Sequence, residues 1–329
     1  MKAEVRNENL SSSFSTTLPV NNYDLDATLD SGQVFRWNRE SGGPSWTGVV
    51  GKHFVRLARM ENGIHAETAA PVEDWGWLRE FLQSDVDLAA ILKTFPSDEP
   101  MRRAVAACHG LRVLRQDPWE CLASFILSST KQIVQIRQIV TQLCDCFGEP
   151  LPIHTDPGQP ASRRTILPRP IGWGEGRGEG KLDVALPCSF PSAQRIASLT
   201  EDQLRSCKMG FRAPNLLATA KLIAGGFDLE RLRHLNYDDA LRELITLPGV
   251  GKKIADCVLL FAYGFDSAFP VDVWIERALR ELYFPKRAIS EKRLKQFAAT
   301  HFGPHAGYAQ QYLFHYMRTK AGNASRKGR

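Results

Sequence analysis

Apolar and polar positions alternate along much of the chain from residue 21 to about residue 70. Aromatic and β-branched residues recur in "QVFRWN", "SWTGVVG" and "HFVRLAR", and turn-forming residues separate these runs. Asn62-Gly63 is a strong signal for a tight hairpin between two short strands. The pattern therefore predicts a small antiparallel sheet.

The spacing of apolar residues becomes helical after Val72. "VEDWGWLREFLQ" and "DEPMRRAVAAC" have the pattern of short amphipathic helices with acidic first turns. A long helical run begins after Asp117-Pro118, and the polar stretch Ser128-Ser129-Thr130 interrupts it. We expect two helices joined at this interruption.

The pattern divides the chain into a small β-containing domain and a larger helical domain. Residues 148–186 are dense in Pro and Gly and predict a flexible surface insertion. The expected segments are a disordered tail (1–20), the β-containing domain (21–110), the helical domain (111–320, interrupted by 148–186) and a basic tail (321–329).

Composition changes this picture little. The net charge of +6 suits a nucleic-acid partner, although many metabolic enzymes carry as much. Seven scattered cysteines, with no secretion signal, indicate reduced thiols, and no cysteine follows Cys257 to complete an iron–sulfur loop. No apolar run is long enough to span a membrane, so we expect a cytoplasmic protein.

The stretch "LPGVGKKIADCVLL" (247–260) carries the first chemical signal. Pro248 ends one helix, and Gly249 and Gly251 permit a tight turn with positive φ before the next helix. Amides at a helix start favour a phosphate, although an ordinary helix connection has the same pattern. Lys252 is expected on a solvated basic face, whereas Lys253 falls in the first turn, where an amine near a carboxylate can form a Schiff base with a sugar.

The run "LPGVGKKIADC…PVDV" resembles the helix–hairpin–helix DNA glycosylase superfamily, and the whole chain is more closely similar to its 8-oxoguanine DNA glycosylase/AP lyase family. Four further stretches carry the resemblance between about Asp30 and Arg318: "SGQVFRW", "LRQDPWECLASFILSS", "MGFRA" and "GYAQQYLF". The resemblance implies an α+β fold, in which a small antiparallel, TBP-like β-sheet domain with helices precedes an all-helical glycosylase domain.

The resemblance also implies the residues of a site. Lys253 would attack C1′ of the damaged nucleotide, and Asp272 would stabilise the charge that develops on the sugar, giving base excision and β-elimination without a required cofactor. The oxidised guanine, flipped from duplex DNA, would occupy a pocket formed by Gly32, Cys257, Pro270, Gln310 and Phe314. DNA contacts are implied for Gly249, Val250, Gly251, Lys252, Thr130, Lys131 and Arg212. Carbonyls of Ile245, Leu247 and Val250 would hold a structural monovalent cation. A monomer associated with a bacterial nucleoid fits this description.

Three departures from the eukaryotic family pattern concern the base opposite the lesion and the helix after the aspartate. Thr130-Lys131-Gln132 replaces an asparagine run, Gln135 replaces an arginine, and Trp274 follows the V-D-V motif in place of histidine. Two alternatives stay open: a related glycosylase for other oxidised or alkylated bases, and a non-catalytic DNA-binding module.

Overall fold

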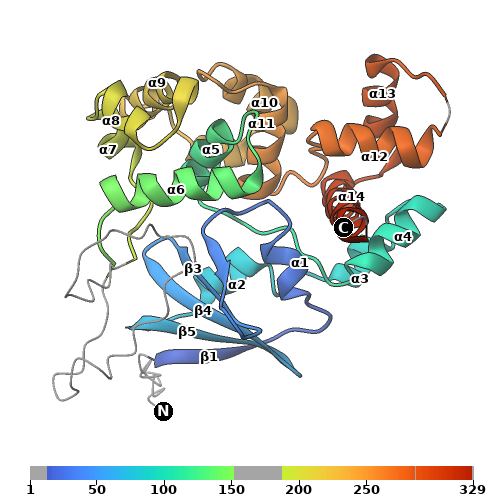
Figure 1. Ribbon diagram of the computed structural model, residues 1–329, viewed down its shortest axis with the longest axis horizontal. Helices are drawn as coiled ribbons and strands as arrows, with labels where there is room; N and C mark the ends of the chain where they lie inside the picture. Colours follow the sequence, from blue (N-terminus) through green and yellow to red (C-terminus); the bar gives the residue numbers. More distant parts are fainter. Residues whose placement is uncertain (1–12, 152–186, 286, 328–329) are drawn as a thin grey trace, which may run out of the picture.

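The computed structural model describes residues 13–151, 187–285 and 287–327. Its first layer is a five-stranded antiparallel sheet with the order β1-β5-β4-β3-β2 (Figure 1). Met60 pairs with Gly63 across the predicted Asn62-Gly63 hairpin. The strands are β1 (Ser13–Pro19), β2 (Trp37–Arg39), β3 (Trp46–Val50), β4 (His53–Met60) and β5 (Gly63–Val72).

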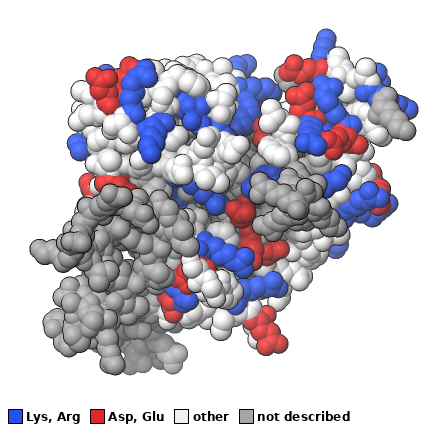
Figure 2. Space-filling view, viewed as in Figure 1, with Lys and Arg blue, Asp and Glu red and all other residues white. Residues whose placement is uncertain are grey.

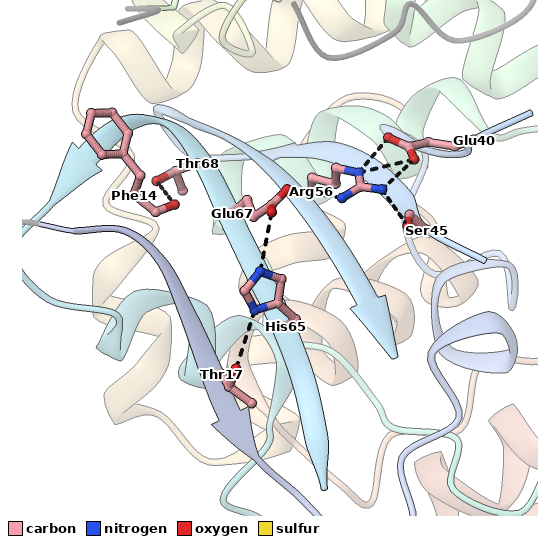
Figure 3. A network of polar contacts seen from close by, with 8 residues as sticks. All are labelled: Phe14, Thr17, Glu40, Ser45, Arg56, His65, Glu67 and Thr68. Carbon is pink, nitrogen blue, oxygen red and sulfur yellow. Dashed lines mark hydrogen bonds and ion pairs between the residues drawn. The ribbon is translucent and has the colours of Figure 1, made fainter. Parts of the chain in front are cut away.

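The sheet has one apolar and one polar face, because successive strand residues point to opposite sides. Val55 and Leu57 of β4 are fully buried with α1 (Leu25–Leu29) and α2 (Gly76–Leu82). Between them, Arg56 points the other way and bonds to Glu40 at 3.0 Å and to Glu67 at 3.1 Å. Figure 3 shows this polar network continuing through His65 to Thr17 of β1.

The remaining helices form the second part of the molecule. Figure 1 shows them grouped along one side of the sheet, with α14 packed beside α4 and α12. They are α3 (Leu88–Leu92), α4 (Glu99–Ala107), α5 (Pro118–Leu127), α6 (Ile133–Phe147), α7 (Ala193–Ala197), α8 (Glu201–Ser206), α9 (Ala213–Ala224), α10 (Tyr237–Ile245), α11 (Lys252–Val258), α12 (Val273–Tyr283), α13 (Glu291–His301) and α14 (Ala306–Lys327), with short η2 (Gly210–Arg212), η3 (Glu230–His234) and η4 (Leu259–Tyr263) turns.

The α+β class predicted from the sequence is confirmed, and so is the break between α5 and α6. Local sequence explains many helix starts, since Asp98, Asp117 and Asn236 each accept a backbone N–H of the first turn. Buried side chains of α3 and α4 pack in the helical core rather than with the sheet, although they precede residue 110.

The predicted N-terminal tail needs correction, and part of the predicted basic tail belongs to a helix. Residues 13–19 are not disordered but form β1, an edge strand that pairs with β5 and buries Leu18. The backbone of α14 continues to Lys327, so most of the predicted basic tail is helical. Residues 1–12, 328–329 and most of the predicted insertion (152–186) lie outside the described residues. Pro150, inside the predicted insertion, forms an isolated bridge with Cys188.

Candidate active site

The turn between α10 and α11 depends on Gly249. Its φ of +78° lies in the left-handed region, and a Cβ there would be 2.8 Å from the Asn215 Cβ atom. Thr219 donates a hydrogen bond to the Pro248 carbonyl at 2.9 Å, which ties the turn to α9. Gly251 differs from the sequence expectation: its φ is −90°, and it is the N-cap of α11. A Cβ at Gly251 would meet no atom within 4 Å, so this glycine leaves the surface of the turn open.

Lys253 lies in the first turn of α11, as predicted, and is half-buried. Its Nζ atom is 5.5 Å from the centre of the Phe125 ring. Asp272 is the N-cap of α12 and accepts the Ile275 N–H at 2.8 Å. Burial raises the pKa of Asp272, while hydrogen bonds from the α12 backbone and the charge of Lys253 lower it. The amine and the carboxylate are therefore close enough to interact.

Cys257 follows Lys253 by four positions, so both side chains lie on the same face of α11. Burial raises the pKa of the Cys257 thiol to about 12, with Lys253 opposing the shift and Asp272 adding to it. The thiol is thus uncharged at neutral pH. Lys253, Cys257 and Asp272 form one group, the hairpin cluster. Pro270 is buried in the loop that leads to Asp272.

A second group brings together residues that are far apart in the sequence. Gly32 has a φ of +81°, and a Cβ there would lie 2.7 Å from Ile133 Cδ1 and 3.3 Å from Phe314 Cε1. Gly32, Ile133 and Phe314 form the turn cluster. Gln310 is one helical turn before Phe314 and only 4% exposed. Its Oε1 atom is buried without a hydrogen-bond partner among the described residues.

Within the motif "SGQVFRW", Gln33 has a structural role. Its side chain is fully buried. Its amide nitrogen donates to the carbonyl oxygens of Thr28 and Arg112, at 3.0 and 2.8 Å, and its Oε1 accepts the Leu114 N–H at 2.8 Å. These bonds fix the turn that carries Gly32, because a buried amide is costly unless it is hydrogen-bonded.

Lys252 is not the freely solvated lysine that the sequence predicted. Its Nζ atom is 3.0 Å from Asp256 Oδ2 and 3.0 Å from the Tyr237 hydroxyl oxygen. Burial raises the pKa of Asp256, whereas hydrogen bonds and charge from Tyr237 and Lys252 lower it. Lys252 therefore compensates a buried carboxylate, although its own side chain is 60% exposed.

The joint between α5 and α6 meets the "MGFRA" segment through Arg212. The Arg212 side chain is only 3% exposed and donates to the Ser129 carbonyl from Nε at 2.8 Å and to Thr130 Oγ1 at 2.7 Å. Thr130 has a φ of +56°, an unusual conformation that these bonds support. Arg212 thus holds the joint together, while Phe211, which stacks on its guanidinium, is 59% exposed. Lys131 of the same joint is half-buried.

Gln135 has a local role that the sequence comparison did not suggest. Its Oε1 atom accepts the Gln132 N–H at 3.2 Å and completes a capping box at the start of α6. The Gln135 amide nitrogen is the donor that this bond leaves for an external group.

Charge on the visible face does not form a single basic field. Figure 2 shows Lys and Arg side chains interspersed with Asp and Glu over this face. Among helices of the described ranges, none is both long and apolar enough to span a bilayer. Within those same ranges, no group of three or more His, Cys, Asp or Glu side chains could hold a metal ion.

Two family models match consecutive parts of the chain. Residues 15–122 match the N-terminal domain of 8-oxoguanine DNA glycosylase, and residues 123–303 match the HhH-GPD superfamily of base excision DNA repair proteins. The chain belongs to the 8-oxoguanine DNA glycosylase family. The family predicted from the sequence is confirmed.

Individual relatives of this glycosylase cover nearly its whole length. A probable N-glycosylase/DNA lyase of Methanothermobacter thermautotrophicus is 31% identical over 92% of this chain and 95% of its own. The structure of MBOgg1 with a low-affinity DNA ligand is 28% identical, has a TM-score of 0.80 and covers 94% of this chain and 98% of its own. The Clostridium acetobutylicum 8-oxoguanine glycosylase/lyase, bound to DNA with cytosine opposite 8-oxoG, is 29% identical with a TM-score of 0.77, covering 91% and 93%.

Sequence reasoning missed several residues that shape the glycosylase site. Gln33 stood inside a recognised motif, but nothing in the motif indicated that it holds the Gly32 turn. Arg137 and Arg318 approach Asp30 from α6 and α14, at 2.9 and 2.8 Å. The sequence marks these two residues only as arginines on amphipathic helices. Many surface arginines have the same pattern, so it does not identify a site residue.

Proposed function

We propose that this N-glycosylase/DNA lyase of base excision repair removes 8-oxoguanine from duplex DNA, with Lys253 as the nucleophile and Asp272 as its partner. The observation that carries the proposal is the hairpin cluster. A partly buried lysine lies in the first turn of one helix, a carboxylate caps the next, and the charge of the lysine lowers the pKa of that carboxyl.

The chemistry follows from an amine at this position. The Lys253 nitrogen gives up a proton and attacks C1′ of the nucleotide, the bond from C1′ to the base breaks, and the base leaves with the bonding electrons and takes up a proton in exchange. The attached amine then passes a proton to O4′, the bond from C1′ to O4′ breaks and opens the sugar ring, and C1′ and the nitrogen form a protonated Schiff base. Removal of a C2′ proton then expels the 3′ phosphate by β-elimination. Asp272 stabilises the positive charge on the sugar and assists these proton transfers.

The proposed base pocket combines both clusters. Cys257 and Phe314 would cover the two faces of the purine, which is consistent with an uncharged thiol and a half-buried ring. The unpartnered Oε1 atom of Gln310 supports a role in binding the Watson–Crick edge. The Gly32 carbonyl would accept the N7 hydrogen that 8-oxoguanine has and guanine lacks. Pro270 would close the pocket beside Asp272.

DNA contacts and the cation are also proposals. The amides of Gly249, Val250 and Gly251 would approach a phosphate, with the start of α11 behind them. Val250 also donates to the Leu247 carbonyl at 3.1 Å, so that carbonyl is already partly engaged. A monovalent cation would bind the carbonyl oxygens of Ile245, Leu247 and Val250. Thr130 and Lys131 would contact the duplex beside the vacated stack, and Arg212 would support them through its hydrogen bonds to this joint. We propose that the enzyme acts as a monomer without a required cofactor.

Borohydride trapping tests the proposal directly. The purified protein is incubated with duplexes that carry 8-oxoguanine, thymine glycol or an abasic site, and sodium borohydride reduces any Schiff base to a stable cross-link. We expect base release and cross-linking with the 8-oxoguanine duplex, cross-linking with the abasic duplex, and little reaction with thymine glycol. Preference for thymine glycol would favour the alternative of a glycosylase for other oxidised bases. Absence of any cross-link would contradict the lysine mechanism.

A further inference from the structure

Arg318 contacts two parts of the proposed pocket at once. It follows Phe314 by one turn of α14, so the two side chains share a helix face. The Arg318 guanidinium carbon lies 5.6 Å from the centre of the Phe314 ring, which is within the range of a cation–π contact. Its Nη1 atom also donates to the Asp30 carbonyl at 2.8 Å.

Asp30 is directly connected to the recognition turn. Gly32 follows two residues later, and a Cβ at Gly32 would reach Phe314 at 3.3 Å. The same turn is held from α14 by Gln311, which donates to the Ser31 carbonyl at 3.0 Å, and from α6 by Arg137. Arg318 thus holds this turn and also lies over the Phe314 ring.

The charge of Asp272, in the hairpin cluster, also acts on Arg318. Burial lowers the pKa of Arg318, Asp30 and Asp272 raise it, and Arg137 lowers it. The guanidinium therefore lies near Asp272 and could affect either the base pocket or the sugar chemistry. The contacts favour the pocket, because the hydrogen bond and the ring contact both go to its residues.

We propose that Arg318 is a positioning residue for base recognition, which fixes the Gly32 turn and the Phe314 ring at the separation that a flipped purine requires. This inference rests on the proposed function and deepens it. The planar guanidinium suits the role because it can lie over a ring and donate a hydrogen bond from its edge at the same time.

The two reactions of the enzyme separate this role from a catalytic or purely structural one. Release of 8-oxoguanine needs the base pocket, whereas cleavage at a preformed abasic site needs Lys253 but no base. Arg318→Met removes both contacts, Arg318→Lys keeps the charge, and Lys320→Met removes one exposed charge from the same helix as a control. Single-turnover rates are measured for both reactions, with thermal unfolding and binding to an abasic-analogue duplex as checks of folding.

We expect Arg318→Met to slow 8-oxoguanine release by roughly tenfold to hundredfold, since a misplacement of about 1 Å has a cost of that order. Abasic-site cleavage should stay within about twofold, Arg318→Lys should recover part of the lost rate, and Lys320→Met should change neither reaction. Equal losses in both reactions would overturn the proposal in favour of an effect through Asp272 or the fold. Unchanged release would overturn it too. A wild-type protein that fails to release 8-oxoguanine would instead contradict the proposed function.

Discussion

The hairpin cluster and the turn cluster are built in opposite ways. Lys253, Cys257 and Asp272 come from two consecutive helices, and a short stretch of sequence places all three. Gly32, Ile133 and Phe314 come from three distant segments and meet only through tertiary contacts. The chemistry therefore depends on local helix geometry, whereas recognition of the base depends on how the sheet domain, α6 and α14 pack together.

The largest effect should come from the hairpin cluster. Lys253→Gln removes the nucleophile, so base release and borohydride cross-linking should both fall to background while duplex binding persists. Lys252→Gln is the matched control, because the neighbouring lysine points to Asp256 instead. A cross-link that survives in Lys253→Gln and disappears in Lys252→Gln would show that the assignment of the two lysines is wrong.

The turn cluster should show a smaller but selective effect. Gly32→Ala introduces a Cβ only 2.7 Å from Ile133 Cδ1 at a φ of +81°, and we expect about 10²-fold slower 8-oxoguanine release with abasic-site cleavage retained. Gly42→Ala is the control, since Gly42 has the same φ but open space around it. Similar rates for the two variants would mean that backbone strain, and not pocket shape, causes any loss.

Choice of the opposite base should depend on weaker interactions. Arg212 is occupied by Ser129 and Thr130, and Gln135 offers a neutral amide whose oxygen already caps α6. A charged bidentate donor rejects a wrong base by roughly 1–3 kcal/mol, so its replacement should leave a cytosine preference below about tenfold. Single-turnover rates on duplexes with each of the four bases opposite 8-oxoguanine measure it. Gln135→Arg should strengthen the preference. A several-hundredfold preference in the unmodified enzyme would instead indicate that Arg212 leaves its buried position.

The smallest effect should be on stability. Among the described residues, Lys252→Gln leaves Tyr237 as the side-chain hydrogen-bond partner of the buried Asp256, and we expect a loss of about 1–2 kcal/mol in the free energy of unfolding. The loss falls below that of a fully buried pair because the Lys252 side chain is 60% exposed. Urea unfolding measures it. The Lys252 charge is already paired with Asp256. Lys252→Gln should therefore lower the number of counterions released on duplex binding, measured from the salt dependence of the binding constant, by less than one. A change of one or more would restore Lys252 as a phosphate ligand.

The same contrast explains what the sequence could predict. The α10–α11 turn and the position of Lys253 followed from Pro248, Gly249 and the apolar helix after them, because those signals are local. The edge strand β1 was missed because "SFSTTLP" is mostly polar, and only its pairing with β5 makes it a strand. Arg212 was expected to face DNA, but its burial against the α5–α6 joint depends on packing between segments far apart in sequence. Arg318 was missed for the same reason.

The contact between Gly32 and α14 has a consequence for the order in which the enzyme folds during protein synthesis. Residues of the sheet and of the hairpin emerge from the ribosome before Phe314 and Gln311 are made. A nascent chain can therefore fold its sheet and form the α10–α11 turn while the turn that carries Gly32 still lacks its support from α14. The protein gains the pocket that selects a base only when α14 docks, so the ability to discriminate between bases is the last property that its folding supplies.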